Sequence, residues 1–374
     1  MPNTPLFFTE LFRYDAFIAG VASLITSLLL VFTKNWHGSF SMDHNSGIQK
    51  MHTSPTPRIG GIGIAVGVLA GFAASSHGIA AAEKRAILST ILLAGMPAFL
   101  FGLLEDVTKK VSVKTRLLAT MASGVLGWGI TGTAITHVDI PGLDFILGFT
   151  VFSVIFTAFA VGGVANSINI IDGFNGLTAG TALIMLAAFG IISRHVGDIP
   201  LAFTCMIISG AVMGFFLVNW PRGKLFLGDG GAYFLGFTLA WIAVLLPERN
   251  SSISPWTSLL ICSYPIIEVG FSIYRRKFLR EDASATQPDA VHLHTLANKR
   301  WAKKIFPTFS KTAQNGLTSP FLWCYALLPC VSAVIFHTNK WLTLAALLFS
   351  LIIYLLMYSK LAFFRWVPKN KNEK

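Results

Sequence analysis

The sequence has 374 residues, of which 53% are hydrophobic and only 12% are charged, and its formal net charge is +12. So few charges in a chain of this length exclude a soluble globular protein and indicate a polytopic membrane protein. The basic residues stand between apolar runs rather than in a stripe interleaved with aromatic residues, so we expect no nucleic-acid partner.

Eleven mostly apolar runs are long enough to span a bilayer, which takes about 17 to 25 residues each. They predict an all-α integral membrane protein in which residues 1–374 form a single transmembrane domain. The predicted spans lie near residues 15–34, 59–80, 86–104, 115–135, 143–165, 174–193, 199–218, 230–247, 254–274, 320–337 and 341–360. The first run lacks an obvious cleavage site for a signal peptidase, so we expect it to remain as a helix.

Lys and Arg are distributed unevenly between the two sets of connections that alternate along the chain. One set, with the C-terminal tail, holds 23 of the 29 basic residues, and the other set holds six. The positive-inside rule makes the first set cytoplasmic, with an external N-terminus and a cytoplasmic C-terminus. The unusual polar sequences all fall in this set, near residues 35–58, 105–114, 166–173, 219–229 and 275–319.

The first cytoplasmic connection ends in Pro-Thr-Pro-Arg-Ile-Gly-Gly, residues 55–61. The prolines stiffen the backbone, and Arg58 offers a planar guanidinium group suited to phosphate. Gly60 and Gly61 allow close approach of other groups at the start of the second span.

Two adjacent acids, Glu105 and Asp106, stand at the end of the third span. Neighbouring residues do not share a helix face, so one acid could bind a metal while the other takes a proton. Exposed acids are also common after a membrane helix, so a purely structural role remains open.

A polar segment from Asn166 to Gly176 interrupts the apolar spans. Asn166, Asn169 and Asp172 recur every three residues, so at a helix end they would project from roughly one face. A carboxylate beside hydrocarbon is costly and is usually kept for a substrate, an ion or a proton. The alternative is a polar cap at a helix end.

Asp229 lies in the sequence Gly-Asp-Gly-Gly, immediately before an apolar span. The glycines leave its carboxylate unshielded and let backbone approach a ligand. With Asp172 and the Glu105–Asp106 pair, it supplies the oxygen ligands that Mg²⁺ prefers when phosphates complete the coordination shell. A simple turn is the alternative.

The fifth cytoplasmic connection carries His292 and His294, which would point the same way on an extended segment. No Cys or third His stands nearby, so we expect contacts to phosphate rather than a zinc site. Residues 297–306 could form a basic amphipathic helix on the membrane surface. Glu268, inside the ninth span, belongs to no motif, and a structural and a functional role are both open.

Together these motifs resemble the polyprenyl-phosphate N-acetylhexosamine-1-phosphate transferase family, of the glycosyltransferase family 4 type. The resemblance covers about residues 43–295 and rests on five motifs in family order. They are Lys50-x-His52 with Pro-Thr-Pro-Arg58 and Gly-Gly61, the Glu105–Asp106 pair, Asn166-x-x-Asn169-x-x-Asp172-Gly, Asn219-x-Pro with Phe226-x-Gly-Asp229, and His292-x-His294.

The resemblance implies roles for these residues. Asp229 and Asp172 are the expected metal ligands for Mg²⁺, with Mn²⁺ as a substitute. The catalytic set comprises Glu105, Asp106, Asp172 and Asp229. The expected substrate-binding residues are Lys50, His52, Arg58, Asn166, Asn169, Asn219, His292 and His294.

Two positions depart from the family pattern. The family usually has Asp-Asp where this chain has Glu105-Asp106, which leaves open which acid is the base. A further His is usual where this chain has Thr295. The histidine pattern is more similar to the O-antigen-initiating branch than to the related muramoyl-pentapeptide transferase.

The resemblance implies an enzyme of the bacterial inner membrane, with a periplasmic N-terminus. It would transfer an amino-sugar 1-phosphate from a UDP-sugar to undecaprenyl phosphate and release UMP, which begins synthesis of O-antigen or a related polysaccharide. A secondary transporter is the alternative, although transporters place polar residues near the middle of the membrane. The sequence leaves open the sugar, a direct or covalent route, and whether the chain forms a homodimer.

Overall fold

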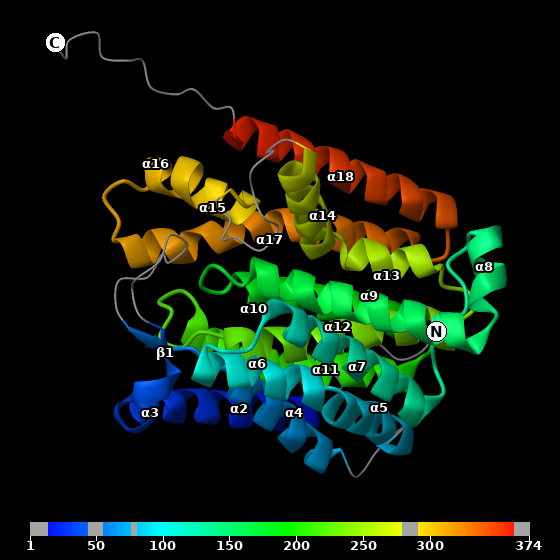
Figure 1. Cartoon of the computed structure of the whole chain (residues 1–374), viewed down its shortest axis with the longest axis horizontal. Helices are drawn as coiled ribbons and strands as arrows, with labels where there is room; N and C mark the ends of the chain where they lie inside the picture. Colours follow the sequence, from blue (N-terminus) through cyan, green and yellow to red (C-terminus); the bar gives the residue numbers. More distant parts are fainter. Residues whose placement is uncertain (1–13, 44–54, 76–80, 279–290, 363–374) are drawn as a thin grey trace, which may run out of the picture.

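A computed structural model describes residues 14–43, 55–75, 81–278 and 291–362 of the chain. Helices form nearly all of these segments, and the two short strands pair with each other (Figure 1). The elements are α2 Tyr14–Phe32, α3 Lys34–Ser41, β1 Met42–Asp43, β2 Thr56–Pro57, α4 Gly61–Ala74, α5 Ala81–Ala94, α6 Met96–Thr108, α7 Val113–Thr131, α8 Pro141–Leu147, α9 Thr150–Ile171, α10 Leu177–His195, α11 Ile199–Asn219, α12 Gly228–Arg249, α13 Pro255–Ile261, α14 Ser263–Phe278, α15 Leu293–Ala297, η1 Asn298–Ala302, α16 Lys303–Ile305, α17 Lys311–Phe336 and α18 Lys340–Ala362.

Each of the eleven predicted spans coincides with one helix or with a bent pair of helices. Within the described segments, seven helices are long and apolar enough to cross a membrane, and two bent pairs raise this number to nine. The second predicted span corresponds to α4, which has 14 residues and precedes residues outside the described segments. The fourth corresponds to α7, whose first turn carries Lys114 and Arg116. The all-α membrane fold is confirmed, and the count of eleven stays a prediction.

Two predicted spans are broken helices rather than straight ones. The third divides into α5 and α6, which meet at 41°, and the ninth divides into α13 and α14, which meet at 76°. Pro97 and Pro265 stand in the first turn after each break. Proline lacks the backbone donor that a continuous helix needs, so the chain bends there.

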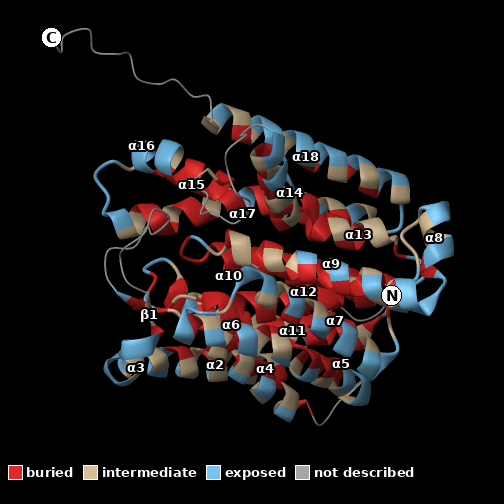
Figure 2. Ribbon diagram, in the orientation of Figure 1, coloured by how far each residue is buried: buried red, intermediate tan, exposed pale blue. Residues whose placement is uncertain are grey.

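Helix α12 forms the centre of the bundle and packs against α4, α6, α9 and α10. It is the most deeply buried of the helices long enough to cross a membrane, and the parts of it visible in Figure 2 are mostly red. Neighbouring helices therefore surround α12 on nearly every side. The first turn of α12, which carries Asp229, is thus held in place by the helices around it.

The bundle has two polar ends. We call the end that contains β1, α3, α15 and α16 the site end, and the end that contains α8 the opposite end (Figure 1). Asp15, near the start of the described chain, bonds Lys84 at the opposite end, whereas Tyr358, near its finish, bonds Arg275 and Val291 O at the site end. The described chain thus begins and finishes at different ends, in agreement with an odd number of crossings.

Candidate functional site

The backbone around Arg58 is held between two neighbouring segments. On one side β2 pairs with β1, and Arg58 N donates to Ser41 O at 2.9 Å. On the other side Phe226 N donates to Pro57 O at 2.8 Å, and Gly60 N donates to Phe226 O at 2.9 Å. These bonds join the first and fourth cytoplasmic connections and place Arg58 beside the start of α12.

Asp106 caps the N-terminus of α12. Its Oδ1 accepts from Asp229 N at 2.9 Å, and its Oδ2 accepts from Gly230 N at 2.8 Å. Arg58 Nε lies 3.0 Å from Oδ1, and Asp106 is fully buried. A carboxylate here satisfies helix donors that have no partner within the helix and faces the positive end of the helix dipole. Asp106 therefore holds both Arg58 and the first turn that carries Asp229.

Glycines let two neighbouring helices meet this turn backbone to backbone. A Cβ atom on Gly61 of α4 would lie 2.3 Å from Gly231, and one on Gly102 of α6 would lie 2.6 Å from the backbone of Asp229. Gly228 has a φ of +75°, a conformation that side chains other than glycine rarely adopt. The close approach expected at Gly61 is confirmed, and the group that approaches is the backbone of α12; Gly231, expected to let backbone approach a ligand, packs instead against Gly61 of α4.

Asp229 is the carboxylate on which the site converges. Arg58 Nη2 donates to its Oδ1 at 3.0 Å, and Asn169 Nδ2 donates to the same oxygen at 3.1 Å. Arg116 Nη1 forms an ion pair with its other oxygen, Oδ2. Three segments far apart in the sequence therefore contact one side chain.

Arg116 is the residue of this site that sequence reasoning missed. Its guanidinium group lies 5.7 Å from the centre of the Tyr233 ring, and its Nε is buried with no acceptor among the described residues. The only signal in the sequence was its position after the acidic pair, where it counted as one of several topology-setting charges. A guanidinium group has five N–H donors, so one that a single carboxylate holds keeps further donors suited to an additional anion.

The polar segment at the end of α9 brings its predicted residues towards α12. Asn169 bonds Asp229, and Asn166 Oδ1 accepts from Tyr233 Oη at 3.5 Å, so both project towards one helix. Asp172 is the C-terminal cap residue of α9. The surrounding protein buries the carboxyl group and raises the pKa of Asp172 to about 6, although the positive charge of Arg58 opposes this shift.

Glu105 and Asp106 have different surroundings, as expected for neighbours on a helix. Glu105 Oε2 accepts from Val111 N at 2.8 Å and is only partly buried, whereas both oxygens of Asp106 are bound by the protein. Glu105 Oε1 accepts no hydrogen bond within the described part of the chain. Of the two acids, Glu105 has the oxygen that is free to exchange a proton.

Asn219 joins two loops beside the site through its amide group. Its Oδ1 accepts from Gly176 N at 2.6 Å, and its Nδ2 donates to Leu225 O at 2.8 Å. The amide thus orders the ends of the segments that carry Asp172 and Asp229, and its role in substrate binding stays a prediction. Lys50 and His52 lie outside the described residues.

His292 and His294 stack on each other, with ring centres 5.2 Å apart and planes at 12°. The ring of His294 lies against Gly173, where an added Cβ would be 3.2 Å from Nε2. His292 Nδ1 lies 2.9 Å from Oε1 of Glu268, which is buried. The structure therefore joins the histidine motif to the end of α9 and gives Glu268 a partner.

The donors around Asp229 suit magnesium rather than zinc. The described residues contain no group of three or more His, Cys, Asp or Glu side chains that could hold a metal ion. Mg²⁺ is usually held by one or two carboxylates together with substrate phosphates and water, so a complete protein cage is not required. Asp229 and Asp172, with the amide oxygen of Asn169, have the chemistry for this kind of site.

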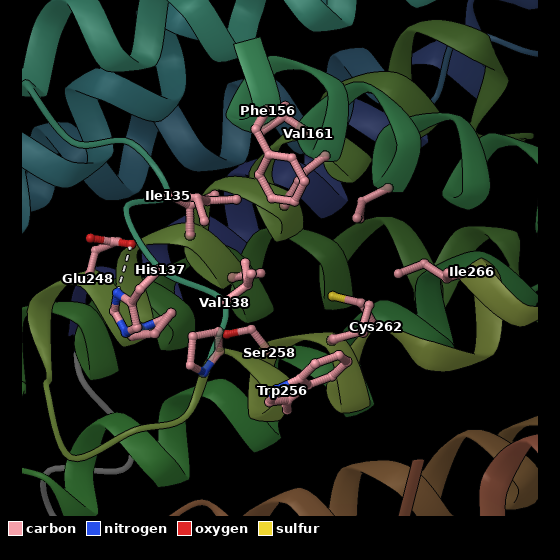
Figure 3. A pocket seen from close by; sticks show the side chains of 18 of the residues that line it. Ile135, His137, Val138, Phe156, Val161, Glu248, Trp256, Ser258, Cys262 and Ile266 are labelled. Carbon is pink, nitrogen blue, oxygen red and sulfur yellow. Dashed lines mark ion pairs between the residues drawn. The ribbon is translucent and has the colours of Figure 1, made fainter. Parts of the chain in front are cut away.

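An apolar cavity of about 260 Å³ lies between α9, α12 and α13 (Figure 3). Phe156 and Val161 of α9 face Trp256 and Cys262 across it. Its rim at the opposite end carries the pair of His137 and Glu248, whose Nδ1 and Oε1 atoms are 3.7 Å apart. Val164 is the last residue of α9 that lines the cavity, and Asp172 is the C-terminal cap of the same helix.

Comparison with known proteins supports one family. The model of the family described as glycosyl transferase family 4 matches residues 88–247. The undecaprenyl-phosphate alpha-N-acetylglucosaminyl 1-phosphate transferase of Yersinia pestis is 30% identical over 256 residues, covering 66% of this chain and 67% of that protein. The protein of that name from Escherichia coli is 28% identical over 283 residues, 73% of each chain.

A third relative carries a similar name. The probable undecaprenyl-phosphate N-acetylglucosaminyl 1-phosphate transferase of Bacillus subtilis is 28% identical over 281 residues, 74% of this chain and 75% of that protein. The chain belongs to glycosyl transferase family 4. The resemblance seen in the five motifs is thereby confirmed, and nothing in the comparisons supports a secondary transporter. The family match includes Asp106, Asn169 and Asp229, but it ends before the histidine motif.

Proposed function

We propose that this multi-pass membrane protein transfers an N-acetylated amino-sugar 1-phosphate from a UDP-sugar to undecaprenyl phosphate. An oxygen of the acceptor phosphate attacks the phosphorus bonded to the sugar, and the bond from this phosphorus to the UMP portion breaks. The products are UMP and a pyrophosphate-linked lipid. The names of the relatives support the reaction class, and the product would begin an O-antigen or a related cell-envelope polysaccharide.

The observation that carries this proposal is the convergence of Arg58, Arg116 and Asn169 on Asp229. Both substrates carry negative phosphates, so the site must offset their mutual repulsion before an oxygen of one can reach the phosphorus of the other. Arg58 and Arg116 provide fixed positive charge from two different elements. Asp106 holds the first turn of α12, so Asp229 and Arg58 need little rearrangement when substrate arrives.

Magnesium is the cofactor that these residues fit, with manganese as a substitute. Asp229 and Asp172 would hold it, and its charge would neutralise the phosphates when bound. Arg58 and Arg116 both contact Asp229, and once magnesium occupies this carboxylate their charge would be available to the phosphates. Glu105 has the free oxygen needed to accept a proton from the acceptor phosphate, while Asp106 is occupied by the backbone of α12.

The apolar cavity supports a lipid acceptor. Val164 and Asp172 are eight residues apart on α9, about 12 Å along the helix axis. A chain attached to a phosphate at Asp172 would have to extend along this length of α9 before it entered the cavity. The cavity volume of 260 Å³ is below the roughly 300–1,000 Å³ of sites that enclose drug-sized ligands, so it would hold only part of a long isoprenoid.

We further propose that the protein resides in the bacterial inner membrane with its site end in the cytoplasm, where UDP-sugars are made. The excess of Lys and Arg in the connections at this end supports that orientation. A cytoplasmic tag at the C-terminus and an external tag at the N-terminus are expected. Two tags on the same side would refute the eleven-span arrangement.

The decisive experiment measures turnover by the purified protein with undecaprenyl phosphate, magnesium and a panel of UDP-amino sugars. We expect release of UMP together with a new pyrophosphate-linked lipid for at least one donor, and no lipid product from the Asp229→Asn variant. UDP-N-acetylglucosamine is the first donor to test, because the relatives carry its sugar in their names. Folded protein that yields no product with any donor would refute the proposal.

A further inference from the structure

Glu268 is a buried acid that the proposed reaction does not use directly. It lies on α14 with 1% of its surface exposed, and its hydrogen-bond partners come from two other segments, the start of α15 and α18. Oε1 lies 2.9 Å from His292 Nδ1 and accepts from Leu293 N at 3.1 Å, while Oε2 accepts from Tyr354 Oη on α18 at 3.0 Å. A buried carboxylate is costly, and three well-placed partners offset that cost.

These contacts determine which nitrogen of His292 carries a proton. Oε1 already accepts from Leu293 N, so Glu268 is placed as an ionised acceptor and His292 Nδ1 must donate to it. No described residue bonds to Nε2 of His292, and this atom is not among the enclosed polar atoms that lack a partner. Nε2 is therefore the ring nitrogen left to bind another group.

The stacked histidines connect this pair to the site. His294 lies parallel to His292 and packs edge-on against Phe174, with ring centres 5.6 Å apart. Its ring also contacts Gly173, the residue after Asp172. A rotation of the His292 ring would disturb this stack, and through it the backbone beside Asp172.

We propose that Glu268 is a positioning residue that holds the Nδ1–H of His292, so that Nε2 faces the substrate, where it accepts from a hydroxyl group when the ring is neutral and donates to a phosphate when the ring is protonated. This inference rests on the proposed function, because it needs a substrate at the site end. Glu268 acts through His292 and does not itself touch the reacting atoms. The acidic side chain in the ninth span thereby acquires a role although no sequence motif surrounds it.

The test is a double-mutant cycle between Glu268 and His292, measured with the donor that the wild-type protein uses. Glu268→Gln keeps the shape and should lower kcat/KM about 10- to 100-fold, the range typical of residues that orient an active group. In a His292→Asn background the same change should have no further effect. Effects that multiply, or a Glu268→Gln variant as active as the wild type, would overturn the inference.

Two further variants separate positioning from stability. Glu268→Asp keeps the charge and should retain more activity than Glu268→Gln, and this comparison holds even where Glu268→Gln folds poorly. Activity of Glu268→Asp equal to or below that of Glu268→Gln would contradict the proposal. Tyr325→Phe removes a buried hydroxyl group that donates to Ser350 O and lies in the same aromatic cluster, so it should lower thermal stability while kcat/KM changes little. A wild-type protein without turnover refutes the proposed function, whereas an active wild type with an unaffected Glu268→Gln variant refutes only the positioning role.

Discussion

Both ends of the bundle bury carboxylates beside arginine, but they satisfy these groups differently. At the opposite end, Arg249 binds Asp198 through two nitrogens, Nε to Oδ2 at 2.7 Å and Nη2 to Oδ1 at 3.0 Å, and Asn250 donates to Oδ2 at 3.1 Å. Burial alone would raise the pKa of Asp198, but the bonds and charge of Arg249 and the bond from Asn250 hold it below its usual value. This cluster is complete without a ligand.

At the site end, several side chains bind the same carboxylate instead of forming separate pairs. Arg58 and Arg116 converge on Asp229, and Arg116 keeps a buried donor that no described residue accepts. Burial raises the pKa of Asp172 to about 6, so its charged form is less favoured than that of an exposed carboxyl group, and an approaching cation would stabilise it. The same residue types are thus structural where they form a closed local pair, and suited to ligands where their pairing is incomplete.

The most direct way to break this comparison is to neutralise one acid at each end. Asp229→Asn keeps the side-chain shape but removes the charge that holds the arginines and magnesium, so turnover should fall at least about 100-fold. Asp198→Asn should leave turnover per folded molecule almost unchanged. The measurement is UMP release at saturating magnesium, with folding checked by size-exclusion chromatography. Near-normal activity of Asp229→Asn would show that the charge of Asp229 is not needed for turnover.

Arg116 tests whether incomplete pairing at the site end serves a ligand. If Arg116 binds substrate phosphate, Arg116→Gln should raise KM for the UDP-sugar and lower kcat/KM by about 10-fold or more, because a hydrogen bond to a charged group is lost. Arg116→Lys keeps the charge but not the planar donor group, so its kcat/KM should lie between those of the wild type and Arg116→Gln. A variant that only loses thermal stability would show that Arg116 merely neutralises Asp229.

The acidic pair sharpens the comparison within the site itself. Glu105→Gln should lower turnover most at acidic pH, where more of the acceptor phosphate carries a proton, and less at alkaline pH. Burial raises the pKa of Asp106 to about 7, so Asp106→Asn should lower turnover most at alkaline pH, where the wild-type carboxylate is ionised, and should also destabilise the protein by about 1–2 kcal/mol because the cap of α12 is weakened. Rate profiles across pH and thermal unfolding separate the two. Identical pH-independent losses would reject this division of roles.

The sequence predicted the fold class and most of the groups at the site. Hydropathy located every long helix, and the charge count placed the motifs on one side of the membrane. Asn169, Asp229 and Arg58 do lie together, because each stands at the end of a span and the spans pack side by side. The breaks at Gly95 and Cys262 were missed because apolar composition continues through them.

Contacts between distant segments could not be read from the sequence. Glu105 and Asp106 look equivalent there, and only the packing of α6 against α12 makes one of them a cap. Glu268 and His292 are 24 residues apart, with neither periodicity nor motif to connect them. Arg116 resembles any charge that sets topology until the fold places it on Asp229.

The smallest effect on turnover is expected at the opposite end, where Arg249→Gln should alter stability alone. Loss of the charged bonds to Asp198 should lower the free energy of unfolding by about 1–2 kcal/mol near pH 7, since Arg249 is partly exposed and its charge is screened. The pKa of Asp198 is lower in the folded protein than the ordinary carboxyl value of about 3.9. The stabilisation from the Arg249–Asp198 pair is therefore complete above about pH 3.9, and it is lost as the pH falls through the pKa of Asp198 in the folded protein. The stability difference between wild type and variant should therefore shrink on acidification, measured by thermal unfolding in detergent. A constant difference across this range, or a fall in UMP release, would mean that the opposite end does more than hold the bundle together.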